Sequence, residues 1–329
     1  MNSWKQRKLK ELCEIKGGKR LPIGENFSSH GYPYIRARDI KNGKVKIEAP
    51  VFVSEAVREK IKRYTTNKND ILITIVGANI GDVGIVPEEL DNASLSENAV
   101  RLTNYKGIFH RYLINVLLSP YSKQIMQQAS AGAAQGKLGI YKINEIPVSV
   151  PPLPIQRKIA SVLTAYDDLI ENNNRRIAIL EKMAEEIYRE WFVRLRFPEH
   201  EKTKIVKGVP DGWEVKRIGD VANATMGQSP PSEFYNQNGD GLPFNQGVGT
   251  YGKRYPRKDV YCNTKGRIAN KGDILISVRA PVGRLNIADC KMIIGRGLSA
   301  LNHKEGKNSY LYYLLKNTFS SEDVIGNGT

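Results

Sequence analysis

The chain has 329 residues, of which 40% are hydrophobic and 26% charged, and its formal net charge is +16. This length suits two globular domains of ordinary size. No apolar run approaches the roughly 20 residues that a membrane helix needs, and the start "MNSWKQRKLKELCEIKGG" lacks the apolar region of a signal peptide. We therefore expect a globular, cytoplasmic protein.

The positive charge is concentrated at the two ends of the chain. Residues 1–151 carry 23 Lys and Arg against 14 Asp and Glu, residues 152–197 carry 8 against 7, and residues 198–329 carry 19 against 13. Two basic bodies favour a polyanionic partner, most commonly nucleic acid. The alternative is surface charge that serves only solubility.

The first part of the chain, residues 1–151, has a mixed α/β pattern. "NKNDILITIV" contains a short β-branched apolar run, which indicates a buried strand, and "VGANIGDVG" after it supplies glycines for a tight connection to the next strand. Residues 109–129 predict one helix, because Leu113, Val116, Leu117 and Ile125 recur near the 3.6-residue period.

The middle part, residues 152–197, predicts a long helix. Prolines lie only at its edges, and a continuous helix over 155–197 would be about 65 Å long at 1.5 Å per residue. One apolar stripe with a period near 3.5 favours a coiled-coil seam, in which Asn173 would fix the register. The alternative is a hairpin of two helices that breaks at "ENNNRR", since Asn is a poor helix former. The candidate partner-binding residues of the stripe are Ile159, Leu163, Tyr166, Ile170, Ile177, Leu180, Ile187 and Trp191.

The last part, residues 198–329, repeats the first. The openings at Trp4 and Trp213, the Gly-x-Pro-aromatic starts "GYPY" and "GLPF", the strands "NKNDILIT" and "NKGDILIS", and the helices "YLINVLLS" and "YLYYLLKN" follow in the same order. Such a long repeat indicates a duplicated domain, because solenoid repeats have periods of only 20–50 residues. Asp70 and Asp273 start the repeated strand singly, so we interpret them as scaffold residues. We expect an α+β chain: two tandem mixed α/β domains separated by a long coiled-coil-forming helix.

No catalytic or metal site is predicted. "GVGTYG" lacks the preceding strand and following helix of a dinucleotide site, and "SPPS" lacks the aromatic residue with which amino-group methyltransferases stack a base. The three cysteines and four histidines do not cluster with ligand spacing, so reduced thiols are expected.

Basic and amide side chains in predicted loops are the candidates for DNA contacts. Arg reads guanine and Asn or Gln reads adenine in the major groove, while at least half of protein–DNA hydrogen bonds go to the backbone. Arg36 and Arg38 alternate on a segment that we expect to be extended, which would place both on one face; Lys19 and Lys258 fit phosphate contacts better. The candidates are Lys19, Arg20, Arg36, Arg38, Asn79, Asn245, Gln246, Arg254, Arg257, Lys258, Arg279 and Arg284.

The stretch "VPPLPIQRKIASVLTAYDDLI" resembles the signature P-L-P-x-x-x-Q-x-x-I-A-x-x-L-x-x-x-D-x-x-I of the specificity subunits of type I restriction-modification systems. The matching residues are Pro152, Leu153, Pro154, Gln156, Ile159, Ala160, Leu163, Asp167 and Ile170. The duplication around a long helix is similar to the same family, so the resemblance covers the whole chain.

This resemblance implies a non-catalytic subunit with two target recognition domains, 1–151 and 198–329, and a conserved spacer helix, 152–197. Each domain would read half of a bipartite, gapped double-stranded DNA site. The helix would recruit two methyltransferase subunits, which hold S-adenosylmethionine, and restriction subunits would join the full complex. No cofactor is expected in this chain itself. The alternatives are the recognition part of a fused type IIG restriction-methylation enzyme and a non-catalytic nucleic-acid-binding scaffold.

The sequence departs from the family pattern where it stops, at "VIGNGT". The second domain, which is C-terminally incomplete by this comparison, has no counterpart of the final strand and long helix that follow the first. We therefore expect methyltransferase helices, or a second copy of this chain, to cover the apolar stripe.

Overall fold

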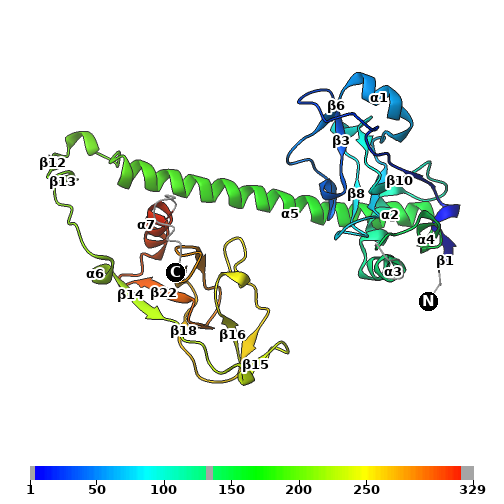
Figure 1. The fold of residues 1–329 in the computed structure, drawn as a ribbon. Helices are drawn as coiled ribbons and strands as arrows, with labels where there is room; N and C mark the ends of the chain where they lie inside the picture. The colour runs from blue at the N-terminus through cyan, green and yellow to red at the C-terminus, as the bar shows by residue number, and fades with distance from the viewer. Residues whose placement is uncertain (1–3, 131–135, 320–329) are drawn as a thin grey trace. The chain divides into compact units, whose positions relative to one another are not determined.

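The computed structural model describes residues 4–130 and 136–319, and the chain divides into two compact units, Met1–Asn173 and Asn174–Thr329. The long helix α5 (Leu153–Tyr188) contributes its first part to unit 1 and its second part to unit 2, and Figure 1 labels the main elements of both. The predicted end of the second domain, residues 320–329, lies outside the described residues.

A six-stranded sheet forms the centre of unit 1. The pairs from β2 through β10 and β7 to β8 are antiparallel, and β5 joins β8 in parallel. In sheet order, the strands are β2 (Glu14–Gly17), β10 (Ala99–Thr103), β7 (Ile71–Thr74), β8 (Val83–Ile85), β5 (Gly43–Val45) and β4 (Ile40–Lys41).

The strand β7 is the predicted "DILIT" strand, and both of its faces are buried. Ile71 and Ile73 pack into one hydrophobic cluster with Leu113 of helix α2 (His110–Leu118), while Leu72 faces a second cluster on the other side of the sheet. A strand buried on both faces needs a continuous apolar run rather than an alternating one. Each such side chain contributes about 1.5–3 kcal/mol by its burial.

Smaller elements complete unit 1. In a three-stranded sheet, the central strand β3 pairs antiparallel with β6 and parallel with β9. A two-stranded sheet joins β1 to β11. The bounds are β1 (Lys5–Lys8), β3 (Tyr32–Ile35), β6 (Phe52–Val53), β9 (Ser94–Leu95), β11 (Pro147–Val150), α1 (Glu55–Ile61), α3 (Pro120–Ser130) and α4 (Ile140–Asn144).

The single helix predicted for residues 109–129 is wrong, since two helices occupy this stretch. α2 ends at Leu118, Ser119 is extended, and α3 begins at Pro120. Proline pushes the residue before it out of the helical region and suits the first position of a new helix. The apolar spacing continues across the break, which is why the pattern alone suggested one helix.

Unit 2 repeats this plan. Its antiparallel four-stranded sheet runs β14–β22–β19–β20, and a five-stranded sheet runs β15–β17–β16–β21–β18 with the pair β16 and β21 parallel, as β3 and β9 are in unit 1. The bounds are β14 (Ala222–Met226), β15 (Tyr235–Asn236), β16 (Leu242–Asn245), β17 (Tyr261–Cys262), β18 (Ile268–Ala269), β19 (Ile274–Ser277), β20 (Leu285–Ile287), β21 (Met292–Ile294), β22 (Leu298–His303), α6 (Ile218–Val221) and α7 (Asn308–Phe319), preceded by the pair β12 (Ile205–Val206) and β13 (Val209–Pro210).

The repeat extends to the packing. Ile274 and Ile276 of β19 lie in one cluster with Leu311 and Leu315 of α7, while Leu275 lies in the cluster on the other face. These contacts match those of β7 with α2. The predicted duplication of a whole mixed α/β domain is therefore present in strand order, strand direction and core.

The helix α5 is continuous through "ENNNRR", so the alternative of a hairpin is wrong. Gln156 ties its start to unit 1: the buried amide accepts a hydrogen bond from Phe109 N at 2.8 Å and donates to Pro151 O at 2.8 Å and Gly107 O at 3.2 Å. A π-helical turn, Arg189–Val193, follows Tyr188.

Within unit 2, α7 and a neighbouring loop pack against the second part of α5. Lys316 donates to Glu185 at 2.7 Å, and Arg254 donates to Glu181 at 3.1 Å while its guanidinium lies 5.6 Å from the ring centre of Tyr312. The rings of Tyr188 and Phe192 contact Tyr310, and Phe192 also contacts Trp213. These contacts hold the second part of the helix to the rest of unit 2.

The three cysteines are free, as expected, and burial raises the pKa of the Cys13 thiol to about 12. In the part of the chain that the structure describes, no helix has both the length and the apolar character needed to cross a membrane.

Candidate nucleic-acid interface

In each unit, several loops meet at one end of the main sheet. In unit 1, β2 and β7 end there and β10 begins there, because Val100 pairs with Gly17 and Ala99 pairs with Thr74. The parallel strands β3 and β9 end at the same place. We call this end the recognition edge. It carries the loops that start at Gly18, Arg36, Ile75 and Ser96.

Four backbone hydrogen bonds join these loops in unit 1. They run from Gly18 N to Ala99 O (3.0 Å), Lys19 N to Leu95 O (2.8 Å), Ser96 N to Ile35 O (3.0 Å) and Ile75 N to Asn98 O (2.8 Å). Such bonds fix the loop backbones where they leave the sheet. A rigid frame of this kind positions side chains that project from it.

The recognition edge of unit 2 has the same four bonds at equivalent positions. They run from Gly227 N to Leu298 O (2.9 Å), Gln228 N to Ile294 O (3.0 Å), Gly295 N to Asn245 O (2.8 Å) and Val278 N to Gly297 O (3.0 Å). The backbone frame is thus conserved between the two units. The side chains on it differ: Lys19 and Arg20 in unit 1 correspond to Gln228 and Ser229 in unit 2.

Gly18 and Gly227 are required for this frame. A Cβ atom at Gly18 would lie 2.0 Å from Ser96 O, and one at Gly227 would lie 2.2 Å from Gly295 O. Backbone approaches this close leave room only for glycine. The "GG" and "MG" of the two sequence openings therefore serve one structural purpose.

Three candidates in unit 1 lie on exposed loops of this edge. Lys19 lies 5.9 Å from the ring centre of Tyr64, and Arg20 donates to Glu97 at 2.7 Å. Asn79 is exposed on the loop between β7 and β8.

The expectation that Arg36 and Arg38 share a face of an extended segment is wrong. β3 ends at Ile35, and residues Ala37–Asp39 form a 3₁₀ turn. Arg36 is half-buried, because its guanidinium donates to the buried carboxylate of Asp39 at 3.2 Å and to Ala49 O at 2.6 Å. Arg38 is exposed.

In unit 2, the assignment of Asn245 as a DNA contact is wrong. Its side chain is fully buried, donates to Met292 Sδ at 3.3 Å and accepts from Thr250 Oγ1 at 2.6 Å. Gln246, the next residue, is exposed and accepts from Ser229 Oγ at 2.9 Å.

The basic candidates of unit 2 separate into two groups. Arg254, Arg257 and Lys258 form ion pairs with Glu181, Asp259 and Asp289 respectively. Arg279 and Arg284 are exposed on the loop between β19 and β20, and neither forms an ion pair with a described residue.

Sequence reasoning missed two charged residues of the recognition edge. Glu97 follows β9, and Arg296 follows β21 at the equivalent position, because Leu95 corresponds to Ile294 in the parallel pairing of each unit. Arg296 is exposed beside a hollow of about 440 Å³ that is also lined by Ser229, Gln246, Thr250 and Tyr235. Glu97 and Arg296 are different residue types, so only the strand register shows that their positions are equivalent.

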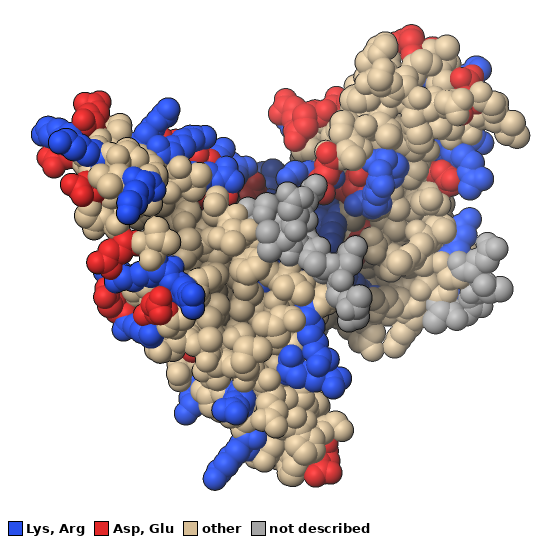
Figure 2. All heavy atoms as spheres, turned by 60° about the vertical axis from the view of Figure 1, so that its left-hand side comes forward, with Lys and Arg blue, Asp and Glu red and all other residues tan. Residues whose placement is uncertain are grey.

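The charges visible in Figure 2 agree with a polyanion-binding surface. On the face drawn, Lys and Arg predominate over the lower part of unit 2, the part that carries β15, β16 and β18 in Figure 1. Such a surface attracts phosphate backbones without regard to sequence.

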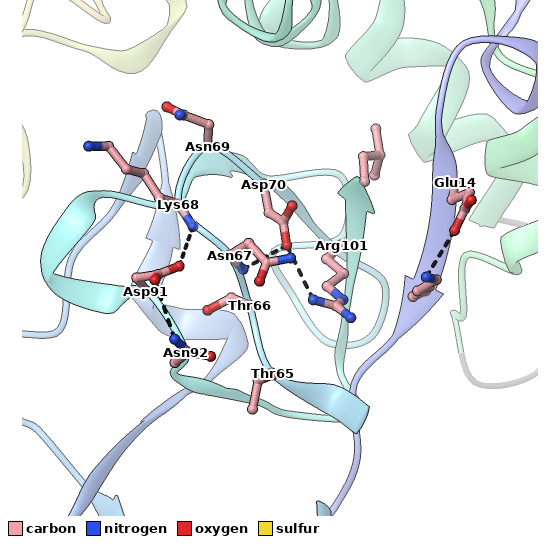
Figure 3. Close-up of polar contacts among 12 residues, drawn as sticks. Glu14, Thr65, Thr66, Asn67, Lys68, Asn69, Asp70, Asp91, Asn92 and Arg101 are labelled. Atoms are coloured by element: carbon pink, nitrogen blue, oxygen red, sulfur yellow. Dashed lines mark hydrogen bonds and ion pairs between the residues drawn. The ribbon is translucent and has the colours of Figure 1, made fainter. Parts of the chain in front are cut away.

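Asp70 and Asp273 lie at the start of β7 and β19, and each caps the turn before its strand. Asp70 accepts from Asn67 N at 2.8 Å, and Asp273 accepts from Asn270 N at 2.8 Å. Asp70 is buried and also accepts from Arg101 at 3.4 Å, as Figure 3 shows. Burial raises the pKa of the Asp70 carboxyl, although the hydrogen bonds from Asn67, Thr103 and Arg101 oppose this effect.

The apolar stripe of α5 is largely uncovered. Seven of the eight predicted partner-binding residues are exposed, whereas Ile159 packs against the core of unit 1 beside the buried Ala160. Ile159 thus helps to dock the helix on its own unit, and its contact with a partner stays a prediction. The exposed fractions of the other seven run from 39% to 62%: Leu163, Tyr166, Ile170, Ile177, Leu180, Ile187 and Trp191.

Comparison with known proteins finds one family throughout the chain. The family model described as "Type I restriction modification DNA specificity domain" matches residues 1–182 and 210–327. A protein of Methanocaldococcus jannaschii described as "Putative type I restriction enzyme MjaX specificity subunit" is 32% identical over 99% of this chain and 78% of its own length. The MjaIX specificity subunit of the same organism is 27% identical over 73% of this chain and 56% of its own length.

The fold also matches a solved structure. The crystal structure of a type I restriction-modification S subunit from M. genitalium aligns with a TM-score of 0.58 over 97% of this chain and 80% of that chain, at 20% identity. At this identity the match shows the shared fold.

Proposed function

We propose that this chain, which belongs to the type I restriction-modification DNA specificity family and is a DNA sequence-specificity subunit, reads a bipartite, gapped double-stranded site. Each unit would read one half-site with its recognition edge. The observation that carries this proposal is the pair of edges with one backbone frame and different side chains. Two copies of one backbone frame that carry different loop side chains can read two half-sites of different sequence.

The gap between the half-sites would be set by α5. The helix is continuous over 36 residues, which is about 54 Å at 1.5 Å per residue. Gln156 fixes its start to unit 1, and Glu181 and Glu185 fix its second part to unit 2.

The exposed stripe of α5 would bind the partner subunits. Exposed apolar side chains that follow one face of a helix need a cover. We assign this role to helices of two methyltransferase subunits, which would hold S-adenosylmethionine, with restriction subunits joining the full complex. Self-association through the stripe is the competing arrangement, and the mass of the purified chain alone separates the two. A monomer that does not aggregate would contradict the need for any cover.

The catalytic groups would then belong to the partners and not to this chain, and the complex would act on cytoplasmic DNA. Family membership supports this division of labour, because the matched family model describes a DNA specificity domain.

Selection from a pool of randomised duplexes tests the reading proposal. The full chain, together with any subunits that co-purify with it, is used to capture duplexes that are then sequenced. We expect two short defined blocks separated by a gap of fixed length and undefined sequence. One continuous block, or capture without any sequence preference, would overturn the proposal.

A further inference from the structure

The two recognition edges carry opposite charges at one equivalent position. Glu97 follows β9 in unit 1, and Arg296 follows β21 in unit 2, each two residues after the strand residue that accepts the bond from Lys19 N or Gln228 N. The flanking backbone bonds are the same in both units. A change of side chain alone has therefore exchanged a carboxylate for a guanidinium.

In unit 1, the carboxylate is held by a neighbour. Arg20 Nε donates to Glu97 Oε1 at 2.7 Å, and the exposed fractions of the two side chains are 79% and 31%. The pair thus presents hydrogen-bond donors and an acceptor to the outside together. Because Arg20 neutralises Glu97, the carboxylate does not leave a net negative charge on a surface that must approach DNA.

In unit 2, the neighbour is different. Ser229 replaces Arg20, and its hydroxyl accepts from Arg296 N at 3.2 Å and donates to Gln246 Oε1 at 2.9 Å. The guanidinium of Arg296 forms no ion pair with a described residue and lies beside the hollow over Tyr235 and Phe244, whose ring centres are 4.5 Å apart. Its planar donors are therefore available to an external acceptor.

The sign of the charge at this position indicates what it faces. A carboxylate only accepts hydrogen bonds, so it has no donor for a phosphate, whereas in the major groove it accepts a hydrogen bond from an amino-bearing base such as cytosine. An Arg at the same position donates to guanine O6 and N7. Base edges, unlike the phosphate backbone, offer hydrogen-bonding partners to both a Glu and an Arg at this equivalent position.

We propose that residues 97 and 296 determine the difference between the two half-sites: Arg296 contacts guanine, and Glu97, held by Arg20, contacts an amino-bearing base. This inference rests on the proposed function, because it assigns bases to the edges that are proposed to read DNA. It also assigns a role to Ser229 and Gln246, which position the Arg296 loop through hydrogen bonds.

The test is the duplex selection carried out on Arg296→Ala and on Glu97→Gln, beside the wild type. Lys291→Ala is the control, since Lys291 is exposed and precedes β21 at the far end of the strand. Arg296→Ala should lower the preference for guanine at one position of one block by about ten- to a hundredfold. Glu97→Gln should change one position of the other block. The control should keep both blocks.

Several results would overturn the inference. If the wild type selects two blocks and both variants select the same ones, the proposed function stands and the inference fails. The inference also fails if both variants alter the same block, or if Arg296→Ala weakens capture uniformly without changing the sequence, since that outcome assigns Arg296 to phosphate. If the wild type selects no blocks, the proposed function and the inference fail together. The positions that stay defined within the altered block show that the substituted unit is still folded.

Discussion

Asp70 and Asp273 each accept a 2.8 Å hydrogen bond from the backbone N–H three residues earlier, but only Asp70 also contacts a buried arginine. Arg101 pairs with Leu72 on the neighbouring strand, and the corresponding residue in unit 2 is Ala300, which pairs with Leu275. The duplicated turn has therefore been kept, while the buried charge is present in one unit only.

This difference predicts unequal effects of the same substitution. Asp273→Ala should cost about 1–3 kcal/mol, because the hydrogen bond that its carboxylate accepts from Asn270 N is lost. Asp70→Ala should cost about 3–5 kcal/mol, because it also leaves Arg101 buried without its counter-charge. Denaturant unfolding of both variants measures this, and equal losses would contradict the ion-pair assignment. Asp70→Ala combined with Arg101→Leu should recover part of the loss.

The close approach at Gly227 predicts that its side-chain-free position is essential to the second recognition edge. Gly227→Ala should lower the stability of unit 2 by about 1–3 kcal/mol, as overpacking does. It should also weaken the base preference in one of the two blocks of the selected DNA. Gly219→Ala is the matched control, because no atom lies within 4 Å of its Cβ position. A Gly227→Ala chain with the stability and selectivity of that control would show that the edge tolerates a methyl group.

The stripe of α5 predicts a variant that folds and fails to assemble. Tyr166 and Ile170 are 62% and 59% exposed, so replacing both with Glu should leave the unfolding transition within about 0.5 kcal/mol. The same change should prevent co-purification of methyltransferase subunits or self-association. The control Lys182→Ala, on the polar side of the helix, should prevent neither co-purification nor self-association. Co-purification that survives the double substitution would assign the stripe another role.

The contact of α7 with α5 predicts a pH dependence in unit 2. A hydrogen bond from Lys316 lowers the pKa of Glu185 below its ordinary value of 4.5. Because the folded-state pKa is the lower one, the contribution to stability is complete above about 4.5 and is lost as the pH falls through the folded value. Lys316→Gln should therefore reduce the difference in stability between pH 6 and pH 3.5. An unchanged difference would show that the pair adds nothing.

The repeated strands were predictable because strands buried on both faces require continuous apolar runs, as "ILIT" and "ILIS" show. Gln156 was identified in the sequence as part of the family signature, but its three hydrogen bonds to the backbone of unit 1 could not be predicted. The break at Pro120 was missed because the apolar spacing continues through it.

The recognition edge was harder to predict than the core. Asn245 and Arg36 have the residue types of DNA contacts, yet Asn245 fills a buried site and Arg36 braces a turn. Glu97 and Arg296 have opposite charges, so a comparison of the two repeats by residue identity does not pair them. Only the strand register and the backbone hydrogen bonds bring them to one position.

The central claim is that two related edges read two halves of one site. Mapping methylated bases across the host genome at single-base resolution, with and without the gene for this chain, tests it most directly. The account predicts that a motif of two short blocks with a fixed gap loses its methylation when the gene is disrupted. A genome in which disruption changes no motif, or removes methylation from one continuous motif, would contradict it.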